Sequence, residues 1–144
     1  ELHELGFNCI IPDILCALGI SQVERANTGL KRSKEIAKQY DKAFENTKIQ
    51  TFIPRRDVGH AYHLYVVEVE NRKELYNYLR ANGIYAQIHY IPLHKMPYYR
   101  NLDNEVINLP NAENYYNKCI SLPMYPSLSN KDQDFVIKTI LEFL

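Results

Sequence analysis

Residues 71–90 constrain the fold most, because an amphipathic helix there passes into a strand with almost no connection. Asn71 and Glu74 match a capping box, and the helix that they open ends at Gly83, a residue typical of helix C-termini. From residue 84 the pattern alternates between two faces. One face carries Ile84, Ala86, Ile88 and Tyr90, and the other carries Tyr85, Gln87 and His89. A domain that contains this unit packs helices against a sheet.

The first third of the chain is predicted to be helical. Pro12 and Asp13 indicate a helix that runs to about Arg25, and its apolar residues cover more than one face. Asn27 and Thr28 are typical caps, so a second, long amphipathic helix is expected after them.

The remaining segments predict a small sheet and two further helices. QTFIP and HAYHLYVVEVE are rich in β-branched and aromatic residues, which favour strands. A helix is expected around residues 112–119, then the turn SLPMYPSLS, and Ser129 is expected to cap the final helix. Few strands separated by helices indicate an α+β fold, with a short sheet packed against helices and preceded by a long connecting helix.

Composition excludes several classes of function. The 144 residues suit one domain, and the 17 basic side chains are balanced by 17 acidic ones, so neither nucleic acid nor a membrane is an expected partner. No apolar run reaches the roughly 20 residues of a membrane span, and the start has no signal peptide pattern. The three cysteines, Cys9, Cys16 and Cys119, form no CxxC pair, which is consistent with a cytoplasmic protein.

His89 and His94 are the main candidates for chemistry, because imidazole donates, accepts and binds a proton near neutral pH. From the residues alone, the favoured interpretation of His89 is a packed or surface-bonded histidine at a strand end. A metal site built from His60, His63, His89 and His94 lacks the spacing and the converging carboxylates or thiolates, so no metal is predicted. The ten lysines lie mostly on polar helix faces, so none is expected to form a Schiff base and no catalytic residue is assigned.

Five stretches, in order, resemble the C-terminal half of the DegT/DnrJ/EryC1/StrS sugar-nucleotide aminotransferases. They are ELGFN with PDILCALGISQ, KEIAKQYDKAF, AYHLYVVEVENRKELYNYLRANGI, IHYIPLH and CISLPMYPSLSNKDQDFVI. The resemblance covers almost the whole chain, and it is nearest to enzymes that make aminated deoxysugars for surface or spore coat polysaccharides. It implies a fold-type-I enzyme that uses pyridoxal phosphate, with the Schiff-base lysine in a large domain outside this chain.

The resemblance also implies domain limits and site residues. Residues 1–46 would link to the large domain, and residues 47–144 would form the small C-terminal domain. In the family, the loop around Asn8 reaches across a dimer toward the cofactor phosphate and the substrate, although here Cys9 and Ile10 replace the tyrosine and arginine of the family's loop. The contacts with the nucleotide-sugar that the resemblance implies are made by Asn8, Gln87, Ile88, His89, Tyr90 and His94.

Two hypotheses follow. In the first, the chain is the C-terminal portion of a pyridoxal-phosphate aminotransferase that transfers an amino group from glutamate to a nucleotide-linked keto-deoxysugar. Alone, it is then expected to be inactive and to bind no cofactor. In the second, the chain is a truncated remnant that acts only as a structural or interaction domain, as the loss of the arginine at Ile10 favours. Under either hypothesis, the apolar segment from Leu5 to Val23 predicts a homo-oligomer.

Overall fold

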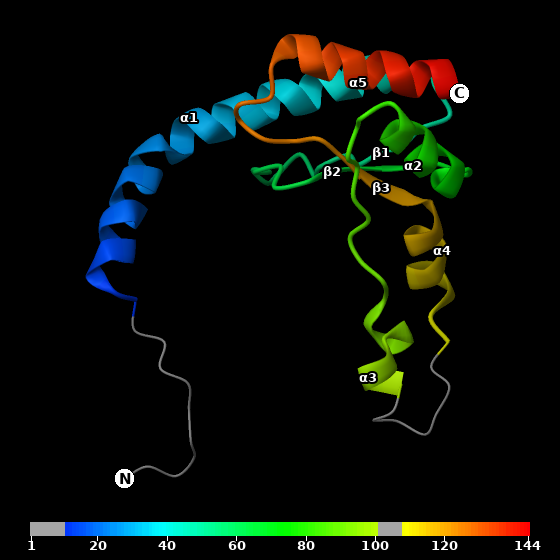
Figure 1. Cartoon of the computed structure of the whole chain (residues 1–144), viewed down its shortest axis with the longest axis horizontal. Coiled ribbons are helices and arrows are strands. Elements are labelled where there is room, and N and C mark those ends of the chain that lie inside the picture. Colours follow the sequence, from blue (N-terminus) through cyan, green and yellow to red (C-terminus); the bar gives the residue numbers. More distant parts are fainter. Residues whose placement is uncertain (1–10, 101–107) are drawn as a thin grey trace.

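The computed structural model describes residues 11–100 and 108–144 and shows helices packed on a small sheet (Figure 1). In chain order the elements are α1 (Asp13–Phe44), β1 (Gln50–Thr51), β2 (Tyr65–Glu68), α2 (Arg72–Ala81), the 3-10 turn η1 (Leu93–Lys95), α3 (Pro97–Arg100), α4 (Pro110–Lys118), β3 (Cys119–Leu122) and α5 (Asn130–Phe143). The predicted α+β class is confirmed. In the described ranges no helix is long and apolar enough to cross a membrane.

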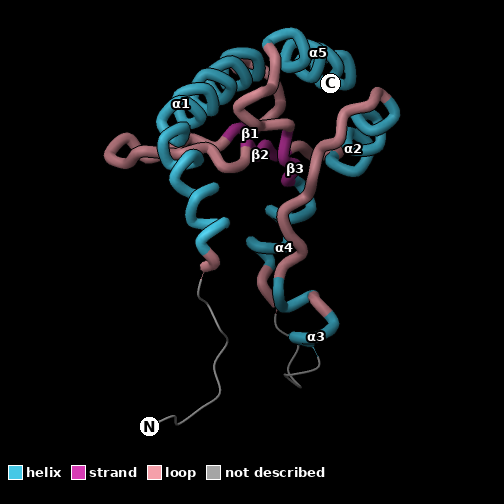
Figure 2. Tube along the Cα trace, turned by 60° about the vertical axis from the view of Figure 1, so that its left-hand side comes forward, coloured by secondary structure: helices cyan, strands magenta, loops and turns pink. Residues whose placement is uncertain are grey.

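The sheet is antiparallel, with the strand order β1-β2-β3. Helices α1 and α5 lie on one side of it, while α4 lies on the other side (Figure 2). The strand register divides the side chains between two faces. The core face carries Tyr65, Val67, Ile120 and Leu122, and the opposite face, here called the outer face, carries Val66, Glu68, Cys119 and Ser121.

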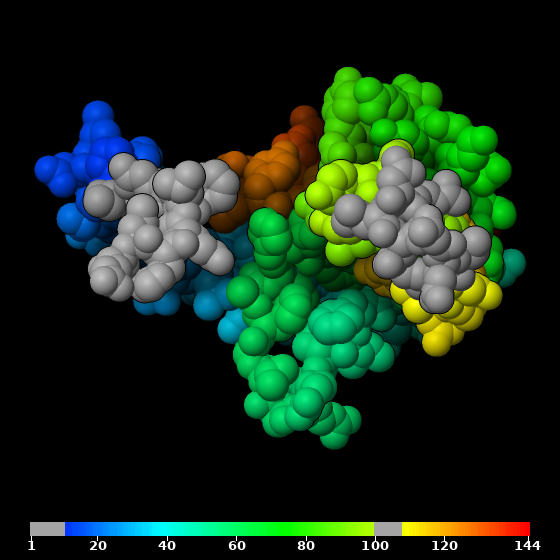
Figure 3. All heavy atoms as spheres, turned by 90° about the horizontal axis from the view of Figure 1, so that it is seen from below, coloured from blue at the N-terminus to red at the C-terminus, as the bar shows by residue number. Residues whose placement is uncertain are grey.

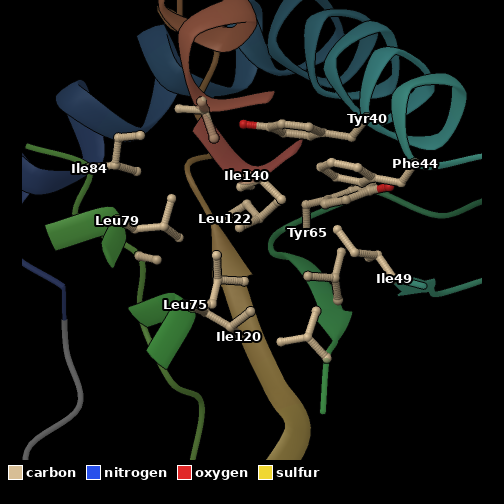
Figure 4. Close-up of a cluster of buried hydrophobic side chains, with 14 of the residues drawn as sticks. Tyr40, Phe44, Ile49, Tyr65, Leu75, Leu79, Ile84, Ile120, Leu122 and Ile140 are labelled. Atoms are coloured by element: carbon tan, nitrogen blue, oxygen red, sulfur yellow. The ribbon is translucent and has the colours of Figure 1, made fainter. Parts of the chain in front are cut away.

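The hydrophobic core lies between the core face and the helices α1, α2 and α5 (Figure 4). Tyr40 of α1 stacks on Phe44 and packs at a tilt against Tyr65, with ring centroids 5.9 and 4.8 Å apart. Leu75 and Leu79 of α2 close one end of this cluster. Burial of these large side chains, at roughly 25 cal/mol per Å² of apolar surface, makes this the main stabilising region of the fold.

The predicted break between two N-terminal helices is wrong, because α1 is one helix of 32 residues. Caps such as Asn27 and Thr28 favour a helix start but do not impose one. Nothing near them lacks a backbone N–H, so the hydrogen-bond ladder continues, and Gly29 inside the helix costs only about 1 kcal/mol. Only the second half of α1 packs against the core, while the first half projects away from it (Figure 1).

The prediction for α2 is confirmed at its end and wrong at its start. Gly83 has φ +75°, and hydrogen bonds from Gly83 N–H to Arg80 and from Ile84 N–H to Leu79 form a Schellman motif. Asn71, however, makes no side-chain capping bond, so the helix begins without the predicted box.

Two further expectations meet different outcomes. Ser129 caps α5 by accepting the Asp132 N–H at 3.0 Å, as predicted. Cys119 was expected inside a helix but begins β3 (Cys119–Leu122). Ser121 and Leu122 were expected in a turn, and they also belong to this strand. Its pairing with β2 decides the conformation, because a four-residue apolar run directly after a helix carries no boundary signal of its own.

Candidate functional site

The outer face of the sheet borders a hollow of about 670 Å³. Its walls come from β1, from the connection between β1 and β2, from Val66 and Glu68 of β2, and from Tyr115 of α4. Figure 3 looks at the molecule from the side of α4, and the green β1–β2 connection protrudes at the lower edge of this view. A hollow of this size with mostly apolar walls and a few polar groups is typical of a ligand site.

The segment with the predicted substrate contacts runs along β3. Gln87 exchanges two backbone hydrogen bonds with Ser121, at 3.0 and 2.8 Å. Within the predicted strand 84–90, which the structure describes in full, this pair is the only β-bridge. The expected strand is therefore an extended segment held at a single residue. Because paired residues share a face, Gln87 lies on the outer face beside Ser121, and Ser121 in turn lies opposite Val66 of the hollow.

His89 lies on the same side of the segment as Gln87. Its Nδ1 is 2.9 Å from the Ser121 Oγ. Tyr90 packs edge-on against the His89 ring, with centroids 4.7 Å apart, and remains 71% exposed. Ile88 is half-buried. The structure thus gathers Gln87, His89 and Tyr90 in one place, with two polar side chains and one exposed phenol ring.

His94 belongs to a separate cluster. Its Nε2 lies 3.1 Å from Glu113 Oε1, and the Lys95 ammonium binds the other carboxylate oxygen. The Lys95 ammonium, and then the His94 imidazole, hold the pKa of the Glu113 carboxyl below its usual range. These contacts join η1 to α4, so the described role of His94 is to connect two elements. Asn8, with Cys9 and Ile10, lies outside the described residues.

The hollow contains an aromatic cluster that the sequence did not reveal as a site. The His60 Nδ1 accepts the Tyr62 backbone N–H at 3.1 Å, and the His60 ring lies 4.5 Å from Tyr62 and 5.2 Å from Phe52. Tyr62 has φ +51°, a left-handed conformation uncommon for an aromatic residue. None of the predicted substrate contacts that the structure describes lines this hollow. The alternating strand pattern of HAYHLYVVEVE gave no sign of this local geometry.

The lysines of the chain are exposed or only partly buried in the part that the structure describes. All ten lie in the described ranges, and none is buried. The two that are partly buried, Lys95 and Lys118, pair with Glu113 and Glu70, so they keep a charged partner. A Schiff-base lysine needs a desolvated neutral amine. Among the described residues, no group of three or more histidine, cysteine or acidic side chains could hold a metal ion.

Comparison with known proteins places the chain in a family. The model of the DegT/DnrJ/EryC1/StrS aminotransferase family matches residues 1–141. The chain belongs to this family. The family confirms the resemblance that the sequence motifs indicated, and the structural neighbours confirm the α+β fold.

Curated relatives and solved structures agree with this assignment. The chain is 35% identical to the spore coat polysaccharide biosynthesis protein SpsC of Bacillus subtilis, over 100% of the chain and 39% of the relative. It is 34% identical to a UDP-4-amino-4,6-dideoxy-N-acetyl-beta-L-altrosamine transaminase of Campylobacter jejuni, over 100% of the chain and 40% of the relative. PseC of Helicobacter pylori, an aminotransferase involved in the biosynthesis of pseudoaminic acid, superposes with a TM-score of 0.89 at 28% identity, over 99% of the chain and 40% of PseC. The chain thus spans about two fifths of these relatives.

Proposed function

We propose that the chain is the substrate-contacting C-terminal portion of a pyridoxal-phosphate aminotransferase. Its substrate would be a nucleotide-linked keto-deoxysugar destined for a surface or spore coat polysaccharide, and glutamate would be the amino donor. Family membership and the relatives' names support this proposal. The residues proposed to contact substrate are Asn8, Gln87, Ile88, His89, Tyr90 and His94.

The observation that carries the proposal is the grouping of Gln87, His89 and Tyr90 beside the outer face. An amide and an imidazole bond sugar hydroxyls or phosphate oxygens, and the exposed Tyr90 ring packs on the apolar face of a sugar. One backbone bridge holds the segment against β3, and the Ser121 hydroxyl holds the His89 ring, on which the Tyr90 ring packs. His94, besides its proposed contact with the substrate, fixes η1 against α4 through Glu113.

The cofactor would lie in the part of the enzyme that corresponds to the remaining three fifths of the relatives. Pyridoxal phosphate supplies the electron sink for amino transfer. Because the lysines of this chain are exposed or paired, none of them is proposed to bind the cofactor. The chain's own share would be to bind and orient the sugar. By itself the chain is therefore proposed to be inactive.

The test is His89→Ala in an enzyme that contains this chain. We expect the KM for the nucleotide-sugar to rise by a factor that corresponds to about 1–3 kcal/mol, while the half-reaction with glutamate keeps its rate. Lys138→Ala, on the exposed face of α5, is the control and should change neither quantity. Equal loss in both half-reactions would assign His89 to the fold or the cofactor instead.

A second candidate function, an interaction domain, is favoured by the first half of α1. Ile14, Leu15 and Leu18 form an apolar stripe on one side of the helix, and Leu18 is 56% exposed. Contiguous apolar surface of this kind is uncommon on monomers. We propose that this stripe forms a homodimer contact, which is compatible with either function and agrees with the oligomer that the sequence predicts.

Leu18→Asp tests the dimer. The variant should shift the chain toward monomer or insolubility, because a carboxylate buried in the contact loses its hydration. Light scattering at micromolar concentration measures the mass, and Lys38→Asp on the packed half of the same helix should leave it unchanged. A monomeric wild-type chain whose first helical turns are protected from hydrogen exchange would contradict the proposal.

A further inference from the structure

Ser121 is an unusual residue for its position. It is 4% exposed, in a strand whose other residues are Cys119, Ile120 and Leu122. A buried hydroxyl is costly unless it is hydrogen-bonded. The partner that the structure gives it is the His89 Nδ1 at 2.9 Å, 32 residues away in the sequence. Since an alanine or valine would fill a strand interior more cheaply, the hydroxyl points to a role outside packing.

The backbone of Ser121 brings His89 into reach. Its N–H donates to the Gln87 carbonyl and its carbonyl accepts the Gln87 N–H, so neither backbone group is free for the imidazole. His89 follows two residues after Gln87, and in an extended segment such residues share a face. One residue of β3 therefore holds the segment by its main chain and the ring by its side chain.

The hydrogen bond also determines which ring nitrogen is free. Nδ1 is engaged by Ser121, and no bond to Nε2 is present among the described residues. When the serine hydroxyl donates to Nδ1, the neutral ring carries its proton on Nε2. An Nε2–H is a hydrogen-bond donor, which suits the hydroxyl and phosphate oxygens of a nucleotide-sugar.

We infer that Ser121 is a positioning residue that fixes the ring and tautomer of His89, so that the Nε2–H faces a ligand oxygen. This inference rests on the proposed function, in which His89 contacts the nucleotide-sugar. Ser121 itself does not touch the ligand. Its effect is transmitted through the imidazole, as for the partners that orient metal-bound or catalytic histidines.

The tautomer is measured on the chain without any ligand. Two-bond ¹H–¹⁵N correlation spectra at about pH 8, above the usual imidazole pKa, should show the His89 proton on Nε2. Ser121→Ala and Ser121→Cys, of which the second keeps the side chain's shape, should move the Nδ1 and Nε2 shifts toward each other. Ser121→Thr should restore the wild-type spectrum, and Ser33→Ala, at a buried serine of α1, should leave it unchanged. Unchanged His89 shifts in both Ser121→Ala and Ser121→Cys, or a proton on Nδ1 in the wild type, would overturn the inference.

Binding is measured separately, with UDP-N-acetylglucosamine as the probe. Ser121→Ala should weaken binding about two- to ten-fold, because it removes the hydrogen bond that orients the His89 ring. Ser121→Thr, which keeps the hydroxyl, should bind as the wild type does. His89→Gln, whose amide nitrogen mimics Nε2, should retain more affinity than His89→Asn, which mimics Nδ1. Equal losses in the two His89 variants would overturn the Nε2 assignment. If the probe does not perturb wild-type His89, the proposed function fails, whereas the tautomer spectra still decide the role of Ser121.

Discussion

The two faces of the sheet share the same strands but have different partners. On the core face, Val67 and Ile120 are enclosed by α1, α2 and α5. On the outer face, Val66 borders a hollow and Ser121 holds a histidine. Neighbouring residues in one strand thus serve different purposes, since alternate side chains point to opposite faces. The core face accounts for stability, and the outer face accounts for the proposed binding role.

The strongest test of this contrast is a matched pair of substitutions in β2. Val67→Ala removes two methyl groups from a side chain that is 1% exposed and should lower the free energy of unfolding by about 2–3 kcal/mol. Val66→Ala makes the same change one residue away, at a half-buried position beside the hollow, and should cost less than about 1 kcal/mol. Urea denaturation measures both values. Similar losses would show that the outer face is packed like the core.

A smaller effect is expected from alkaline pH, and its largest part should originate on the core side, although burial also raises the pKa of Tyr62 and Tyr115 at the hollow. Burial raises the pKa of Tyr40, and burial together with the hydrogen bond to the Asp41 carboxylate raises the pKa of Tyr65. A folded-state pKa above the unfolded value means that the stabilisation is fully present below about pH 10 and declines as pH rises above it. Each tyrosine should contribute a slope of up to about 1.4 kcal/mol per pH unit.

Tyrosine variants check the origin of that slope. Tyr65→Phe removes one titrating group from the core face and should reduce the loss of stability between about pH 10 and 11. Tyr90→Phe changes a phenol that is exposed near the outer face and should leave the slope unaltered. A slope insensitive to Tyr65→Phe would mean that other groups cause the alkaline unfolding.

The sequence predicted those parts of the fold that depend on local signals. The C-terminal glycine of α2 and the Ser129 cap of α5 were found because each makes its hydrogen bonds within a few residues. The break in α1 was predicted wrongly because cap residues inside a helix have the same local signature as real caps. The strand β3 was missed because its conformation is decided by β2, some fifty residues earlier in the chain.

The candidate site divides in the same way. Gln87, His89 and Tyr90 were named from a motif, and the structure places them together beside β3. His94 came from the same motif but lies in a cluster with Glu113 and Lys95, which no local pattern indicates. Ser121 was not predicted because its contact with His89 exists only after Gln87 has paired with β3. The role of these side chains as substrate contacts stays a prediction.

The central claim is that Gln87, His89 and Tyr90, beside the outer face, bind a nucleotide-sugar. Titrating the ¹⁵N-labelled chain with UDP-N-acetylglucosamine tests this claim most directly. We expect saturable shift changes at Gln87, His89 and Tyr90, with little change at Val67 and Ile120 on the core face. In His89→Ala, the shift changes caused by UDP-N-acetylglucosamine should be smaller, and they should saturate only at a higher ligand concentration. Saturable shifts confined to another region, or none at millimolar ligand, would contradict the claim.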